Sequence, residues 1–261
     1  MRRLACLLVL ASGLVLPGTP IAPARAAEPR MADGGTAIVA EVPDGRTLVL
    51  ADGRVVRLAG LGAVEDGTRP PTSFAASAKG ALAKLVLGHT VRLRLPERPI
   101  DRYGRVVAQV FDERGTWIQG ELVRTGLARV ESAADGRGMV RAMQEIEDVA
   151  RVARLGIWSD NRYGVRTPEE TGKHLNGFEI VDGRVMAADQ VGGRVYLNFG
   201  PDWRTDFTVS VAPTDVRTFR REGVDLLAMQ GKRIRVRGWL RSYNGPVIDV
   251  THPEQIELLG P

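Results

Sequence analysis

The order of short apolar runs constrains the fold of this chain more than any other feature. Alternating apolar residues at 37–42, 47–50 and 55–58, separated by Pro-Asp-Gly and Ala-Asp-Gly turns, predict a three-strand meander. Ser73 can begin a helix that Gly88 ends, and strands are expected at 90–95 and 106–111. Five strands with a helix between the third and fourth are the order of an OB-type barrel. Helices at 116–125 and 139–155 complete the unit, so the predicted fold class is mainly β with helices (α+β).

The same order recurs in the C-terminal part of the chain. Residues 161–176 are polar and predict a linker, and a second unit spans 177–261. Its strands are expected at 178–186, 195–198, 207–211, 233–240, 247–250 and 256–259, with a helix at 213–222. The placement of that helix favours a second OB-like barrel, and a generic small antiparallel β-domain remains the alternative.

Residues 1–26 have the pattern of an export signal. Arg2 and Arg3 precede an apolar stretch at 4–16, and Ala24-Arg25-Ala26 is a small-x-small cleavage site. The stretch is too short to span a bilayer, so an exported, periplasmic or secreted protein without a transmembrane segment is predicted. A cytoplasmic protein with an apolar N-terminus is the alternative.

Composition limits the chemistry. The one cysteine, Cys6, lies inside the predicted signal, so the mature chain would have no disulfide, catalytic thiol or zinc–thiolate site. The formal charge of +5 includes three arginines of the signal, which leaves +2 for the mature chain. Such a weak balance does not attract polyanions by net field, so nucleic-acid binding would need local patches.

Arg57, Glu65 and Arg105 are the candidate catalytic residues. Arg57 ends one strand-like run, Glu65 follows a turn-like stretch, and Arg105 closes an Asp-Arg-Tyr-Gly-Arg segment. Two guanidiniums can hold phosphate oxygens through planar forks of donors, and a carboxylate can orient or deprotonate a water. The alternative is a structural role, in which the two arginines form salt bridges with Glu65.

Several segments, taken together, resemble the staphylococcal-nuclease (thermonuclease) family over about residues 36–160. They are Val-Pro-Asp-Gly-Arg-Thr at 42–47, Val-Arg-Leu at 56–58, Asp-Arg-Tyr-Gly-Arg at 101–105, Leu-Val-Arg-Thr-Gly-Leu-Ala-Arg at 122–129 and Gly-Ile-Trp-Ser at 156–159. The resemblance implies hydrolysis of nucleic-acid phosphodiesters with a calcium ion. It implies phosphate-holding roles for Arg57 and Arg105, a water-positioning role for Glu65, and contact of Tyr103 with a nucleotide phosphate.

The chain departs from that family at its metal site. Asp44 matches a carboxylate near the metal, but Arg46 and Gly62 stand where the family has two ligating aspartates. Calcium needs several anionic oxygens, and replacing a ligand by a cation costs on the order of several kcal/mol. The stacking tyrosines of the family are replaced by Ser132 and Ala134. We therefore expect no cofactor, or calcium only if nuclease activity is retained, and we expect Arg46 to bind phosphate.

A basic strand in the second unit is the other candidate site. Side-chain alternation places five residues on one face, and a basic face with an aromatic is typical of single-strand nucleic-acid binding. Acids and bases balance from residue 177 onward at eleven each, which favours the alternative of a solvated strand. The five residues are Arg233, Arg235, Arg237, Trp239 and Arg241.

Three hypotheses of function follow. The first is a catalytically weakened thermonuclease-like protein that binds nucleic acid or another oxyanion ligand. The second is an active nuclease with an altered metal site, held through Asp44, Glu65 and Asp66. The third is a protein-binding scaffold of the cell envelope. The sequence does not set the oligomeric state.

Overall fold

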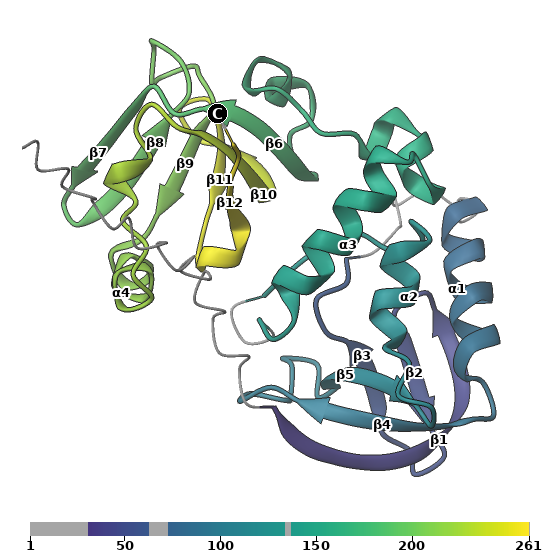
Figure 1. Cartoon of the computed structure of the whole chain (residues 1–261). Helices are drawn as coiled ribbons and strands as arrows, with labels where there is room; N and C mark the ends of the chain where they lie inside the picture. Colours follow the sequence, from purple (N-terminus) through teal and green to yellow (C-terminus); the bar gives the residue numbers. More distant parts are fainter. Residues whose placement is uncertain (1–30, 63–72, 134–136, 261) are drawn as a thin grey trace, which may run out of the picture.

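The structure is a computed structural model that describes residues 31–62, 73–133 and 137–260. The predicted export signal, Glu65, Asp66 and Ala134 lie outside the described residues. Figure 1 shows two β-rich units with the helix α3 (Val140–Val152) on the side of the first unit that faces the second. In the described part of the chain no helix is both long and apolar enough to cross a membrane.

The first unit is a closed five-stranded barrel with the strand order β1-β2-β3-β5-β4. Strands β3 and β5 run parallel and the other neighbours antiparallel, which confirms the predicted OB-type barrel. Helix α1 (Ser73–Val86) joins β3 to β4, and α2 (Ile118–Arg124) follows β5. The strands are β1 (Ala32–Asp44), β2 (Thr47–Leu50), β3 (Val55–Leu58), β4 (Thr90–Leu95) and β5 (Val106–Asp112).

The barrel core fixes the turn between β1 and β2. Leu48, Leu58 and Leu82 are fully buried in one apolar cluster that joins the strands to α1. In the turn, a Cβ on Gly45 would lie 2.7 Å from Cβ of Ala78 on α1, closer than real side chains approach. Only glycine therefore lets the turn dock on the helix, and this docking sets where the neighbouring side chains project.

The second unit contains seven strands and one longer helix, α4 (Pro213–Arg221). Six strands and the helix agree with the predicted positions to within a few residues. Strand β7 was not predicted as separate, because its mostly exposed sequence Ala-Ala-Asp-Gln-Val shows no apolar alternation. The strands are β6 (Phe178–Arg184), β7 (Ala187–Val191), β8 (Arg194–Asn198), β9 (Thr208–Val211), β10 (Arg233–Ser242), β11 (Pro246–Asp249) and β12 (Ile256–Leu258).

Strands β6 and β7 behave as two halves of one bent strand. The first half pairs with β10 and the second with β8, just as β1 pairs with β4 through its first half and with β2 through its second. Strand β9 pairs in parallel with β11, as β3 does with β5. The second unit therefore repeats the connectivity of the first barrel, with β12 added beside β10. The predicted OB-like topology holds for both units.

The segment predicted as a linker packs between the units. It contains short 3-10 helices at Asn161–Tyr163 and Pro168–Lys173, and a third precedes it at Gly156–Ser159. Tyr163 is buried in an apolar cluster with Ile157, Trp158 and Ile180, which joins the end of the first unit to β6. Two further 3-10 helices lie at Leu227–Met229 and Pro253–Gln255.

Candidate functional site

Arg57 is the half-buried centre of the candidate site. Strand β3 turns its neighbours Val56 and Leu58 into the core and leaves the arginine on the outer face. Burial, and next the charge of Arg46, lowers the pKa of the Arg57 guanidinium below its ordinary value. Within the described residues its hydrogen bond is a long one, 3.4 Å from Nη2 to the backbone oxygen of Leu61. As far as the described residues go, most of its donors can therefore serve an anionic ligand.

The structure brings the other two predicted cations to the same place. Arg46 and Arg105 both lower the pKa of Arg57, which requires them to lie within its electrostatic range. Arg46 projects from the β1–β2 turn, where its backbone N–H donates to Oδ1 of Asp44 at 2.8 Å. Among the described residues the Arg46 side chain has no ion pair. Arg46 and Arg105 therefore both lie near the Arg57 guanidinium, and the strand register agrees, because Thr47, the neighbour of Arg46, pairs with Arg57.

Asp101 fixes the position of Arg105 and of the loop at residues 101–105 through hydrogen bonds. Its Oδ2 accepts from Nε of Arg105 at 2.8 Å, and its Oδ1 accepts from the backbone N–H groups of Tyr103 and Arg105. Burial works to raise the pKa of Asp101, but the hydrogen bonds from Arg105 and Tyr103 lower it overall. The Tyr103 ring is 66% exposed and lies 5.2 Å from the Arg105 guanidinium. Sequence reasoning missed Asp101, although its spacing before Tyr103 and Arg105 is that of an Asx turn.

Glu131 supplies a carboxylate that sequence reasoning also missed. It raises the pKa of Arg57, and its Oε2 lies 2.6 Å from the point that a Cβ at Gly62 would occupy. Its carboxylate therefore fills the space that an aspartate at Gly62 would need. Its Oε1 accepts a hydrogen bond from Nε1 of Trp239, which belongs to the second barrel, at 3.3 Å.

The described residues do not fit a calcium ion. Within residues 31–62, 73–133 and 137–260 no three His, Cys, Asp or Glu side chains converge on one point. Asp44 is engaged by its own turn, and the cation of Arg46 projects from that turn. Calcium requires six to eight oxygen ligands, several of them anionic. The contribution of Glu65 falls outside the described residues.

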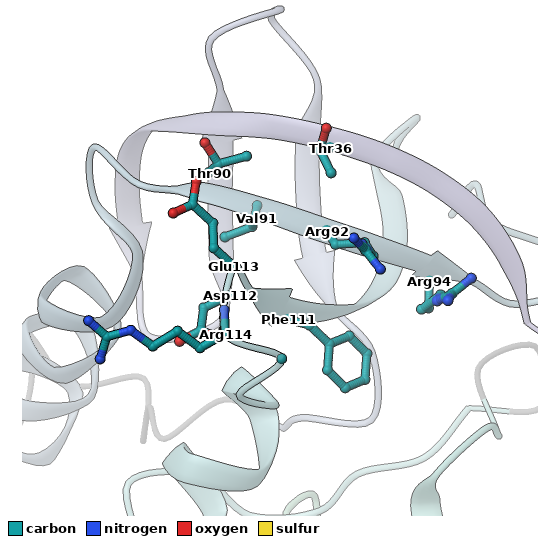
Figure 2. Close-up of a pocket in the computed structure, with 10 residues that line it drawn as sticks. Thr36, Thr90, Val91, Arg92, Arg94, Phe111, Asp112, Glu113 and Arg114 are labelled. Carbon is teal, nitrogen blue, oxygen red and sulfur yellow. Dashed lines mark hydrogen bonds between the residues drawn. The ribbon is translucent and has the colours of Figure 1, made fainter.

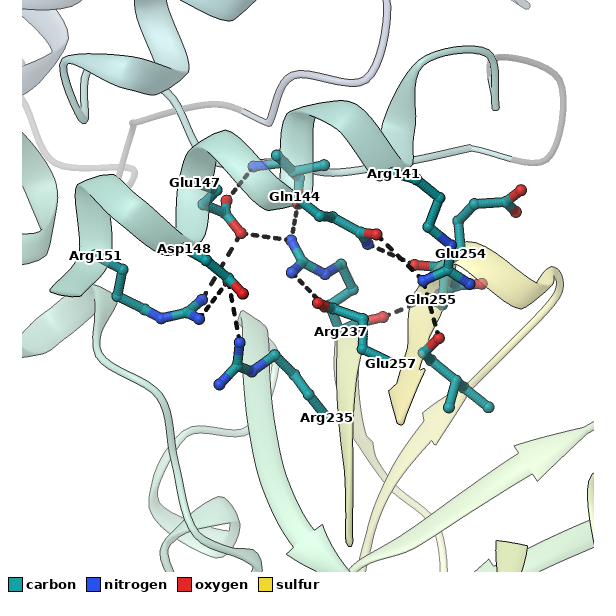
Figure 3. A network of polar contacts seen from close by, with 12 residues as sticks. Arg141, Gln144, Glu147, Asp148, Arg151, Arg235, Arg237, Glu254, Gln255 and Glu257 are labelled. Atoms are coloured by element: carbon teal, nitrogen blue, oxygen red, sulfur yellow. Dashed lines mark hydrogen bonds and ion pairs between the residues drawn. The ribbon is translucent and has the colours of Figure 1, made fainter. Parts of the chain in front are cut away.

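The predicted basic face of β10 is wrong for Arg235 and Arg237, because α3 covers it. Arg237 is fully buried, and its Nη1 and Nη2 donate to Glu147 at 2.7 Å and Glu257 at 2.6 Å. Burial alone would lower the pKa of Arg237, but these two carboxylates raise it (Figure 3). Arg235 makes a bidentate pair with Asp182. Alternation along the strand correctly groups these residues, but it does not reveal that an acidic helix packs on them.

The three remaining residues of that face have different surroundings. Arg233 and Arg241 are exposed, and Arg241 pairs with Asp249. Trp239 is 57% exposed and packs edge-to-face on Phe178, with ring centroids 6.3 Å apart. Of the five predicted residues, Trp239 alone reaches the arginine site, through its hydrogen bond to Glu131.

A separate cavity of about 560 Å³ opens over β4 and β5, on another part of the first barrel. Figure 2 shows its arginines, Arg92, Arg94 and Arg114, together with Phe111 and Glu113. None of the predicted site residues lines it, so it is not the candidate site.

Comparison with known proteins agrees with the geometry of the first barrel. The family model described as "Staphylococcal nuclease homologue" matches residues 55–160. Residues 55–160 are therefore a staphylococcal-nuclease-like domain. A protein of Schizophyllum commune named "Probable endonuclease LCL3" is 34% identical over 129 residues, which cover 44% of this chain and 43% of that protein. A protein of the same name from Paracoccidioides lutzii is 31% identical over 138 residues, which cover 48% and 39%.

The chain thus spans about two fifths of the length of these curated relatives. The matched part of the nuclease-like domain contains Arg57 and Arg105, whereas Asp44 and Arg46 lie just before it.

Proposed function

We propose that the nuclease-like domain binds a phosphodiester of nucleic acid, or a related oxyanion, and hydrolyses it weakly or not at all. Arg46, Arg57 and Arg105 hold the phosphate oxygens, and Tyr103 contacts the ligand at the rim of the site. The related proteins are named as probable endonucleases, so nucleic acid is the favoured ligand.

One observation supports this proposal above the others. Arg46 and Arg105 each lie within electrostatic range of Arg57, and of the described carboxylates that act on Arg57, Asp101 is bonded to Arg105 and Glu131 to Trp239. Like charges at short range repel, and the negative charge of a bound phosphodiester relieves that repulsion. Metal catalysis needs an open ligand set that can activate water, and the described residues do not provide one.

Trp239 provides a surface on which a base could stack. Its indole is more than half exposed and is held beside the arginine site by Glu131 on one side and Phe178 on the other. Aromatic side chains beside a phosphate-binding groove are the usual platform for single-stranded nucleic acid. We propose that it substitutes for the aromatic residues lost at Ser132 and Ala134.

An active nuclease with an altered metal site is the second candidate. The position of Glu131, whose carboxylate occupies the space beside Gly62, favours it. In this alternative, Asp44 and Glu131 would hold a metal together with Glu65. We also propose export to the periplasm or the medium; N-terminal sequencing of the protein from culture fractions tests it, and an intact Met1 would contradict it.

A digestion and binding experiment separates the two candidates. The purified protein is incubated with single-stranded DNA in millimolar calcium and in chelator, beside Arg57→Ala. We expect salt-sensitive binding that Arg57→Ala weakens, with little cleavage in either buffer. Robust calcium-dependent cleavage that Arg57→Ala abolishes would establish the second candidate instead.

A further inference from the structure

The second barrel carries a large cavity that none of the predicted sites includes. Its volume is about 860 Å³, within the range of small-molecule pockets. It lies over the outer face of strands β7, β8, β9 and β11, which Figure 1 shows next to one another. In the OB topology established above, β8 and β9 are the second and third strands, and the loop between β10 and β11 is the one that flanks the ligand face in OB folds.

Polar side chains form the floor of this cavity. Thr208 and Ser210 project outward from β9 and yet are only 7% and 5% exposed. Thr208 Oγ1 donates to Oδ1 of Asn198 at 3.1 Å, and Nη1 of Arg194 donates to Oγ of Ser210 at 2.8 Å. The floor is therefore a preformed set of hydroxyl, carboxamide and guanidinium groups, fixed by hydrogen bonds across two strands.

Exposed aromatic rings form its walls. Trp203 is 52% exposed and Tyr243 is 69% exposed, although large aromatic side chains are usually buried. They come from the loop before β9 and from the loop after β10, so two separate loops place rings at one cavity. Arg204 lies 4.6 Å from the Trp203 ring centroid and stabilises one face of the indole. Tyr196 of β8 adds a third ring.

The charges of the lining argue against a polyanion. Three carboxylates, Asp189, Asp215 and Asp249, face two guanidiniums, those of Arg194 and Arg241. Arg241 pairs with Asp249, and Arg194 interacts electrostatically with Asp215. A groove for nucleic acid needs more cations than anions along its path. The lining of this cavity has more carboxylates than guanidiniums.

We propose that this cavity binds a neutral oligosaccharide. Sugar rings present apolar C–H faces to aromatic side chains and a rim of hydroxyls to carboxylates, carboxamides and guanidiniums. The cavity provides both kinds of group in one place, without the net charge that a phosphate backbone requires. The site is separate from the arginine site of the first barrel, so this inference does not rest on the proposed function.

Calorimetric titration of the full chain tests the proposal. The probes are chitotetraose, cellotetraose and maltotetraose, with octathymidylate as the anionic comparison. We expect at least one tetrasaccharide to bind, and Trp203→Ala and Tyr243→Ala each to weaken it about tenfold. Trp239→Ala, which removes an exposed tryptophan outside the cavity, and Arg57→Ala should change it less than about twofold.

Each other outcome overturns the proposal. No binding of any of the three tetrasaccharides at millimolar concentration excludes a neutral-sugar site. So does sugar binding that neither aromatic substitution weakens. Binding of octathymidylate that Trp203→Ala abolishes would assign the cavity to nucleic acid instead. Because Trp203 and Tyr243 are more than half exposed, both truncations leave the core intact, and unchanged melting temperatures confirm this.

Discussion

The two barrels share a strand order and use their arginines in opposite ways. In the first barrel Arg46 and Arg105 lie near Arg57, and the described carboxylates that act on Arg57 are Glu131 and Asp101, of which Asp101 is bonded to Arg105. In the second, the arginines in the middle of β10 are covered by α3 and matched to Glu147, Asp148, Asp182 and Glu257. A basic strand therefore indicates a binding surface only when its neighbours leave it open.

The difference also shows what holds the barrels together. The buried contact between them includes an apolar cluster, and it also includes the fully buried ion pair of Arg237 and Glu147. Removing water from two charges is unfavourable, and only good geometry and further hydrogen bonds compensate for it. Here Glu147 also accepts from the backbone N–H of Val130 at 2.6 Å. We hypothesise that the pair fixes the orientation of the barrels more than it adds stability.

The largest expected effect comes from breaking that pair. Arg237→Ala leaves Glu147 buried with its charge unmatched and should lower the free energy of unfolding by about 3–5 kcal/mol. Urea denaturation measures it. Arg233→Ala, on the same strand but exposed, is the matched control and should change stability by less than about 0.5 kcal/mol. A loss below about 1 kcal/mol for Arg237→Ala would contradict a buried ion pair.

A pH effect of nearly the same size should arise at His252, which joins the barrels through its Nε2 and Oγ of Ser132, 2.7 Å apart. Burial, against the attraction of Glu254, lowers the pKa of His252 from 6.5 to about 4. Because the pKa of His252 is lower in the folded state than in the unfolded state, its contribution to the free energy of unfolding is fully present above pH 6.5. That contribution is lost as the pH falls towards 4. The loss should be on the order of 3 kcal/mol.

Denaturation at several pH values measures this loss. His252→Gln should flatten the dependence between pH 6.5 and 4, because glutamine does not titrate. If the wild-type and variant curves run parallel across that window, His252 does not titrate as inferred.

A smaller effect is expected at the open arginines. Arg57→Ala should weaken binding of thymidine 3′,5′-bisphosphate by about 10- to 100-fold, since hydrogen bonds to charged groups contribute about 1.5–3 kcal/mol. Calorimetry measures the affinity, and Arg241→Ala serves as the control because its guanidinium pairs with Asp249. Equal losses from the two substitutions would remove the contrast between the barrels.

The smallest effect concerns the residue that belongs to both regions. Trp239→Ala should weaken binding of octathymidylate by about fivefold or more, because base stacking contributes about 1–3 kcal/mol. An abasic oligonucleotide of equal length should bind the variant and the wild type alike. If the variant loses affinity for both ligands equally, Trp239 acts on the phosphate site through Glu131 and not by stacking.

Local pattern was sufficient to predict most of the fold. Turn residues and apolar alternation placed the strands, and the helix between the third and fourth strands indicated the OB order in both units. Strand β7 was not predicted, because it is mostly exposed and so shows no apolar alternation. The candidate site was harder to predict. Glu131 lies 69 positions after Gly62 (131 minus 62), and only the folded chain brings the two residues together. The burial of Arg237 depends on α3 of the other unit, which no local pattern contains.

The contact between Glu147 and Arg237 limits how this protein can be divided. A fragment ending before the second barrel would keep the whole nuclease-like domain. It would lack Arg237, so the Glu147 carboxylate of α3 would face solvent without its cation. It would also lack Trp239, whose indole is bonded to Glu131. The two barrels are thus not independent domains that can be exchanged without further change. Recombination or truncation between them changes the chemistry of the part that remains.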